Sequence, residues 1–475
     1  MSNPTDSPVT APRPRRRRLR WSLVLLLIFI APPAGYYFYA TWSLQSELAE
    51  VIAETDRLDP RWRLEDIEAD RKTFRDEENA ALQVILASRL ILNRPTEHLN
   101  HGQVFFDVQA QTQLNSQQID IIREALQKMP AALIEARKLK DMPGGRFPIT
   151  FSENWISTPL HQTDCHRLFN VLRHDALLRV QQGDPDAALE SCRALLNAAR
   201  ALGDEPRLAS QQLRLAGDQE LLPTVERCLA QGYPGAEAMK SLQDSLSSER
   251  TDAKSNFIHA LRGQRAGYYR LYLLATQGKI EWNAFTPRGI PKTSFGVWFR
   301  DKVPLLNARD YPRHLRHMNE LVSTAKLPLD QQLNRFHELQ PVDLGGADFS
   351  FGWLSSMDKT CEYNVRIQAG LAYAESGLAC ERFRIAHERW PESLAELVKA
   401  KLLDAAPTDP YDGQPLRLVK RKDGITVYSV GKDKEDNGGN IDPNGESGPG
   451  TDLGFRLWDP KHRRQPPRPP VALGR

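Results

Sequence analysis

The sequence predicts a mainly α-helical protein with an N-terminal transmembrane helix, a body of helical hairpins or a bundle, and a C-terminal α+β module. Three observations predict this class. A stretch near the N-terminus carries no charged residue over residues 21–42. From about residue 43 to 400, apolar residues recur at helical spacing between Gly and Pro breaks. Two short apolar runs near residue 420 flank an Asp-Gly turn, which is typical of a β-hairpin.

Length and composition set the broad class. The chain has 475 residues, which is room for about two to four domains. Its 40% hydrophobic and 26% charged content excludes collagen-like, wholly disordered and polytopic membrane proteins. The net charge of +3 is too small to indicate a nucleic-acid partner. Arginine-rich ends over 1–20 and 461–475 flank a mildly acidic body.

The uncharged stretch from Trp21 to Trp42 is long enough to cross a ~30 Å hydrocarbon layer. Arginines precede it, and aromatic residues gather at its far end, where rings suit a membrane interface. We therefore expect a single-pass signal anchor in a bacterial inner membrane, with a basic cytoplasmic tail over 1–20 and an extracytoplasmic body. A cleaved signal peptide is the alternative, since Pro32 and Pro33 could end its apolar region. Cleavage after Ala34 or Ala40 would place Pro32 or Phe38 at the −3 position, which requires a small residue, and this favours a retained anchor.

The helical body is expected over 43–356, and its clearest unit runs from 164 to 231. Gly183, Asp184 and Pro185 supply a C-cap glycine, an N-cap aspartate and an N1 proline in succession. This order predicts a tight turn between two helices. The stretch over 183–196 resembles a tetratricopeptide-type turn, but the breaks at 183, 203 and 232 lack that repeat's fixed spacing of 34 residues. We expect helical hairpins without a regular repeat, either as a packed bundle or as a protein-binding array.

Candidate chemistry in this body is sparse. None of the familiar nucleophile, phosphate-binding or dinucleotide-binding motifs occurs. His161 and Cys165 share a helical face, but a zinc site would need a further ligand from elsewhere. His314 and His317 are expected to be solvated. The cysteines are expected to act as small buried hydrophobic residues, and a single disulfide between two of them is the alternative. They are Cys165, Cys192, Cys228, Cys361 and Cys380.

Two segments, 276–310 and 340–356, are rich in Gly, Pro and aromatic residues and are expected to be long loops. Trp282, Trp298 and Trp353 could line a pocket there. Rings that fasten a loop to the core are the commoner arrangement.

From residue 357 the pattern sharpens. Apolar and small residues alternate at spacings of four and three from Val365 to Ala386, which predicts a long helix. A short helix follows Trp390-Pro391. Strands are expected at 415–420 and 425–430, joined by a turn that contains Asp423-Gly424.

The order of these elements resembles the globular domain of the major pseudopilin of type II secretion systems, over about 357–459. The resemblance implies a long helix packed on a small antiparallel sheet, followed by a calcium-binding loop. The N-terminal stretch lacks that family's Gly-Phe processing site. The residues that carry the resemblance are Trp390-Pro391, Asp409-Pro410-Tyr411, Gly413, Pro415, Ser429-Val430-Gly431-Lys432-Asp433, Asp452-Leu453 and Trp458.

The loop from 433 to 446 has five carboxylates and one lysine. Oxygen atoms that repel one another on a Gly-rich backbone favour a cation such as Ca²⁺. The resemblance implies Asp433 and Asp452 as ligands, with backbone carbonyls near Val430, and Asp436 is a local candidate. A solvated acidic loop without an ion is the alternative.

Taken together, these patterns predict a membrane-anchored structural or interaction protein, secretion- or envelope-associated, with protein partners and no enzymatic activity. One alternative is a helical-repeat receptor with a peptide groove along 164–275. Another is an enzyme whose pocket is formed by the two long loops. The tail over 460–475 is Pro- and Arg-rich and is expected to be disordered.

Overall fold

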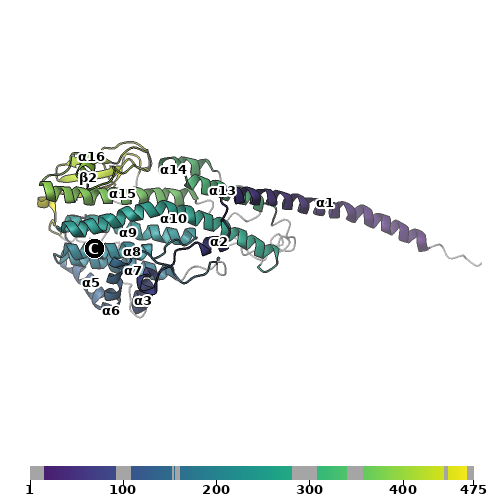
Figure 1. Ribbon diagram of the computed structural model, residues 1–475, viewed down its shortest axis with the longest axis horizontal. Coiled ribbons are helices and arrows are strands. Elements are labelled where there is room, and N and C mark those ends of the chain that lie inside the picture. Colours follow the sequence, from purple (N-terminus) through teal and green to yellow (C-terminus); the bar gives the residue numbers. More distant parts are fainter. Residues whose placement is uncertain are drawn as a thin grey trace, which may run out of the picture.

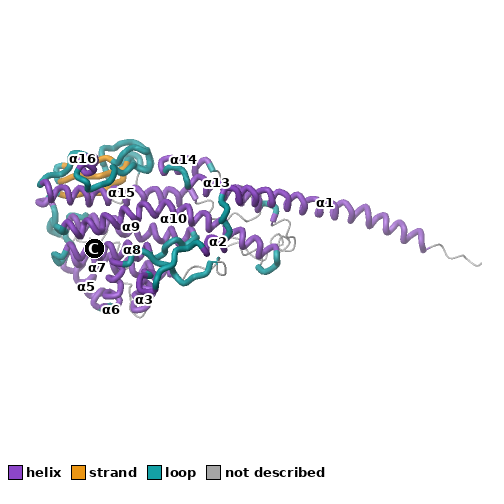
Figure 2. Tube along the Cα trace, in the orientation of Figure 1, coloured by secondary structure: helices purple, strands orange, loops and turns teal. Residues whose placement is uncertain are grey.

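The computed structural model describes residues 15–91, 108–151, 155, 161–280, 308–339, 357–442 and 448–467, except the side chains of 15–27 and 358. Figures 1 and 2 show an elongated helical body with a small sheet at one edge. The longer helices are α1 (Arg15–Leu58), α3 (Ala80–Ile91), α5 (Ser116–Gln127), α6 (Pro130–Lys138), α7 (His161–Gln181), α8 (Pro185–Arg200), α9 (Leu208–Gln231), α10 (Ala236–Thr276), α13 (Tyr311–Ala325), α14 (Leu329–Glu338) and α15 (Met357–His387). The short helices are α2 (Leu64–Ala69) and α16 (Leu394–Lys399), and the strands are β1 (Arg417–Arg421), β2 (Gly424–Ser429) and β3 (Leu453–Trp458).

Helix α1 extends away from the body as a long arm (Figure 1). Its C-terminal part packs against α13, where Asn319 donates to the Thr55 hydroxyl at 2.8 Å. Farther along the arm, large apolar side chains such as Phe29, Phe38 and Trp42 are exposed.

Within the described ranges, no helix combines the length and the apolar character that a membrane crossing requires. The transmembrane helix predicted over 21–42 is therefore wrong, and so are the single-pass topology and the inner-membrane localisation inferred from it. The prediction relied on the absence of charge. However, Pro32, Pro33 and the tyrosines at 36, 37 and 39 contribute little hydropathy, and Glu47 soon follows.

The hairpins of the body form where the sequence predicts them. Gly183 has φ +87°, Asp184 accepts the N–H of Ala187 at 3.1 Å, and Pro185 begins α8. A left-handed glycine ends α7, and the aspartate caps α8 immediately afterwards. Helices α7, α8 and α9 consequently pack against one another in succession.

Helix α15 joins the helical body to the sheet. It contacts α9, α10 and α14 as well as β2 and β3, and residues of all these elements share one hydrophobic cluster. Two glycines permit the close approach: a Cβ at Gly370 would lie 2.3 Å from Leu222, and one at Gly377 would lie 2.6 Å from Phe455. The segment over 357–459 therefore packs into the body through a continuous core.

The sheet is an antiparallel meander in the order β1-β2-β3. Arg421 pairs with Gly424 across the predicted hairpin turn, and Val427 pairs with Phe455 in the next ladder. The predicted hairpin is confirmed. The third strand, β3, was not predicted as a strand, and it supplies Phe455 to the contact with α15.

Residues 460–467, which we call the strap, were expected to belong to a disordered tail but lie against the body. Arg463 pairs with Glu381 of α15 at 2.7 Å, and both side chains are buried. Arg464 donates to the carbonyls of Gln231 and Val180 at the ends of α9 and α7. Arg464 therefore supplies a donor to the last carbonyl of α9 and a second donor to that of Val180, which also accepts the N–H of Gly183.

We predict that Arg463→Met lowers the free energy of unfolding by about 2–4 kcal/mol, because it removes one member of a buried ion pair. Urea denaturation of the full chain measures this difference. The matched control is Lys461→Met, an exposed position in the same strap, which should change stability by less than about 0.5 kcal/mol. Equal losses in the two variants would contradict the prediction.

Glu226 of α9 connects the helical body to the sheet. Its carboxylate accepts the backbone N–H of Arg456 in β3 at 3.1 Å. Burial raises the pKa of Glu226 to about 7, although the bond from Arg456 opposes this shift. The folded state therefore holds this proton more tightly than the unfolded chain does.

The raised pKa gives Glu226 a stabilising effect below about pH 4.5 that is lost as the pH rises through about 7. Glu226→Gln keeps an acceptor for Arg456 but cannot ionise. We predict that the variant gains about 1–3 kcal/mol relative to the unsubstituted protein between pH 5 and pH 8. Urea denaturation at both pH values measures the gain. Parallel pH profiles for the two proteins would contradict it.

Candidate polar site in the C-terminal module

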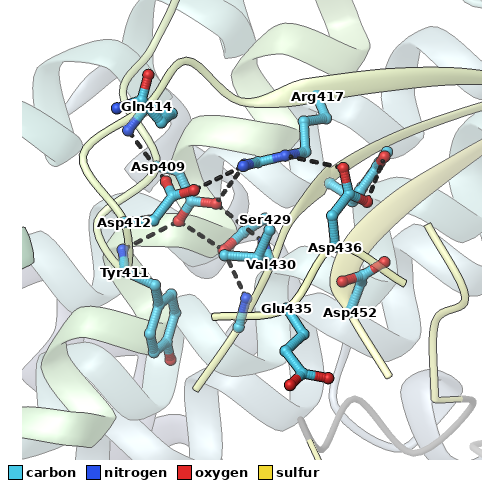
Figure 3. A network of polar contacts seen from close by, with 12 residues as sticks. Asp409, Tyr411, Asp412, Gln414, Arg417, Ser429, Val430, Glu435, Asp436 and Asp452 are labelled. Carbon is cyan, nitrogen blue, oxygen red and sulfur yellow. Dashed lines mark hydrogen bonds and ion pairs between the residues drawn. The ribbon is translucent and has the colours of Figure 1, made fainter. Parts of the chain in front are cut away.

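A network of carboxylates, one arginine and backbone amides lies beside β1 and β2 (Figure 3). The loop before β1 brings Asp409 and Asp412 to this place. Asp409 accepts the N–H of Tyr411 at 3.0 Å, and Gly413 has φ +75°. An aspartate that bonds to the backbone two residues ahead, followed by a left-handed glycine, forms the tight turn that this sequence requires.

Asp409 is the centre of the network, and its residue exposure is 0%. Beyond the bond from Tyr411, it accepts the hydroxyl of Ser429 at 2.7 Å and the N–H of Val430 at 2.9 Å. Burial raises its pKa, while these hydrogen bonds act in the opposite direction. One carboxylate thus fastens the loop before β1 to the end of β2.

Arg417 of β1 lies between two groups of carboxylates (Figure 3). It pairs with Asp412 at 2.6 Å, Asp409 at 3.2 Å and Asp436 at 3.3 Å. Partial burial alone would lower the pKa of Arg417, but these three carboxylates raise it. The guanidinium therefore supplies the positive charge that the acidic loops need.

The predicted metal ligands lie near one another but bind protein groups. Asp433 accepts the N–H groups of Glu435 and Gly450, each at 3.2 Å. Asp452 accepts those of Asn437 at 3.3 Å and Gly439 at 2.7 Å. Val430 contributes its N–H to Asp409.

Asp436 has three partners of its own. It accepts the Tyr428 hydroxyl at 3.0 Å and the N–H of Gly438 at 2.9 Å, besides its ion pair with Arg417. Burial alone would raise its pKa, but the Gly438 and Tyr428 hydrogen bonds and Arg417 together lower it. Burial and the bond to Asp436 raise the pKa of Tyr428 to about 12, so the phenol stays a donor at neutral pH.

In the part of the chain that the structure describes, no three His, Cys, Asp or Glu side chains are grouped to hold a metal ion. Over those residues, this finding contradicts calcium binding as a general property of the protein. It does not test the individual ligands, so Asp433, Asp436, Asp452 and the carbonyls near Val430 stay predictions. In the structure, backbone amides, Tyr428 and Arg417 bind these carboxylates. Burial raises the pKa of Asp452, and the charges of Asp436 and Asp433 add to this effect.

The structure gives His161 partners that the sequence did not indicate, and it buries two histidines that were expected to be solvated. His161 meets Glu205 with its Nε2 at 3.1 Å and stacks on Phe147 at 4.2 Å, a partnership across 44 residues that no local motif signals. Burial raises the pKa of Cys165, and the charge of Glu205 adds to that shift. His314 and His317, expected to be solvated, are both buried.

The alternative enzyme pocket was placed in segments 276–310 and 340–356. Nearly all of these residues, with Trp282, Trp298 and Trp353, lie outside the residues that the structure describes. The predicted burial of the cysteines is confirmed for all five.

A surface groove of about 450 Å³ lies at the α7–α8 turn, the end of α9 and the strap. Asp184 and Asp186 line one part of it, and Tyr233 and Arg464 line another. Tyr233 is 54% exposed, and the guanidinium of Arg463 lies 5.2 Å from its ring. The groove thus offers two carboxylates and an aromatic ring to the solvent.

Comparison with known proteins gives no match to a family model, to a curated protein or to a solved structure. The geometry of this chain is therefore the basis for any functional proposal.

The central residues Asp409 and Arg417 were not among the predicted site residues. The turn sequence around Asp409 carried a signal, because Asp-Pro followed by Asp-Gly favours a tight turn with side-chain hydrogen bonds. Arg417 carried no signal, since it joins the loop before β1 to Asp436, which follows β2.

We predict that Asp409→Asn lowers the free energy of unfolding by about 2–4 kcal/mol, because an amide nitrogen would then face an N–H or guanidinium donor in a buried place. Urea denaturation measures the loss. Asp412→Asn is the matched control: Asp412 also pairs with Arg417 but is partly exposed, so about 1 kcal/mol or less is expected. A loss at Asp412 as large as that at Asp409 would contradict the prediction.

Proposed function

We propose that this chain is a structural and interaction protein in which a pseudopilin-like segment is built into a helical scaffold. The observation that carries the proposal is α15, which packs against the helices of the body and against β2 and β3. A long helix on a small antiparallel sheet is the arrangement that the pseudopilin resemblance implies. Because the helix also belongs to the core of the body, the segment serves here as part of a larger rigid unit.

The polar network supports a scaffolding role. Asp409 holds the loop before β1 to the end of β2, and Arg417 bridges this loop to Asp436. Asp452 in turn accepts two amides of the acidic loop. These contacts fix the loops beside the sheet and so present a defined surface to a partner.

The surface that the proposal assigns to a partner is the outer side of β1. This strand stands at the edge of the sheet order β1-β2-β3, and Lys420 and Arg421 are exposed there. An edge strand with basic side chains resists self-association. Lys420 pairs with Glu392 at 2.6 Å and Arg421 donates to the Gly438 carbonyl at 2.8 Å, so an acidic protein partner would exchange for these exposed contacts. The pseudopilin resemblance places such a partner in a secretion assembly.

The groove beside Tyr233 favours a second candidate, a receptor for a peptide. Its volume of about 450 Å³ falls within the usual range of ligand sites. The carboxylates of Asp184 and Asp186, with an exposed ring nearby, suit a segment that carries arginine or lysine.

Site-specific photo-crosslinking in the native cells tests both candidates. The photoreactive amino acid p-benzoylphenylalanine would replace Lys420 at the sheet edge, Tyr233 in the groove, or Ile134 as an exposed control on α6. We predict one discrete ultraviolet-dependent adduct at Lys420, at least fivefold above Ile134. A discrete adduct at Tyr233 alone would favour the peptide receptor and contradict the first proposal. Adduct yields at Lys420 and Tyr233 no higher than the yield at Ile134 would contradict both.

A further inference from the structure

Cys192 of α8 and Cys228 of α9 face each other inside the body. Their sulfur atoms are 3.9 Å apart, and each residue has an exposure of 0%. The two helices are consecutive and pack closely. The fold therefore brings together two thiols that are separated by 36 residues in sequence.

We propose that Cys192 and Cys228 are a dithiol site that reacts with a disulfide oxidant, such as oxidised glutathione, to form one intramolecular disulfide between α8 and α9. The two thiols lose two protons and two electrons, and an S–S bond forms between them. The oxidant's disulfide bond breaks and takes up both electrons and both protons, which yields two glutathione thiols. The exchange passes through a mixed disulfide on one cysteine, which the other cysteine then resolves.

The two sulfur atoms lie near bonding distance. A disulfide has a sulfur separation of about 2.05 Å, so the two atoms must approach by roughly 2 Å.

The remaining cysteines are placed differently. Cys361 and Cys380 both lie on α15, where a 19-residue separation at 1.5 Å per residue places them about 28 Å apart. Cys165 lies on α7. Cys192 and Cys228 are therefore the pair that we assign to the single disulfide that the sequence allowed.

The reaction should be slow in the native state. The hydrogen bond with Cys228 and burial raise the pKa of Cys192, with the charge of Asp175 adding to the shift. A neutral buried thiol is a poor nucleophile. Oxidation should therefore proceed when α8 and α9 separate locally or while the chain folds. Once formed, the disulfide restrains the unfolded chain and stabilises the hairpin.

Mass spectrometry of the full chain tests the site. The protein is incubated with oxidised glutathione at a urea concentration just below unfolding, returned to buffer, and treated with iodoacetamide. We expect a disulfide between tryptic peptides 180–193 and 228–240, sensitive to dithiothreitol. The oxidised protein should melt at least 3 °C higher than the reduced protein.

Two variants provide the comparison. Cys165→Ala, at a buried position on α7, should keep the linked peptides and the melting shift, whereas Cys192→Ala should lose both. If Cys192→Ala does not fold, the peptide map of the unsubstituted protein decides alone. Unlinked peptides after oxidation, a bridge to another cysteine, or a melting shift retained in Cys192→Ala would each overturn the proposal.

Discussion

The burial of α15 is the constraint on which the rest of the structure depends. Every residue from 367 to 381 is buried, so helices and strands must cover this helix on all sides. Its charged residues then need partners inside the core. Arg250 of α10 meets Glu375 at 2.9 Å, and Arg463 of the strap meets Glu381. The position of α10, the sheet and the strap all follow from covering one helix.

Packing alone would leave the loops around the sheet undetermined, and polar contacts fix them. Asp409 holds one loop to β2, Arg417 links it to the acidic loop, and Glu226 connects β3 to α9. Each contact joins segments that are distant in sequence or belong to different elements. Carboxylates of the kind that the sequence suggests as metal ligands therefore hold separate backbone segments together.

Local patterns predicted the elements well, because turns and caps depend on neighbouring residues. The Gly183-Asp184-Pro185 turn, the long helix after 357 and the β-hairpin are examples. Features that depend on distant partners were not predictable. His314 and His317 lie in a basic, polar stretch but are buried by packing from other elements. The charge of the acidic loop was evident from the sequence. Its partners, Arg417 and backbone amides, were not. The membrane helix was inferred from missing charge, although proline and tyrosine lower the hydropathy.

The strap has a consequence for the order of events during synthesis. Arg464 donates to the C-terminal carbonyls of α7 and α9 from more than 230 residues farther along the chain. Arg463 lies 82 residues beyond its partner Glu381. A nascent chain on the ribosome must hold these helices without these partners until residues 463 and 464 emerge from the exit tunnel. Until then the open ends of α7 and α9 are places where chaperones could bind and where misassembly could begin.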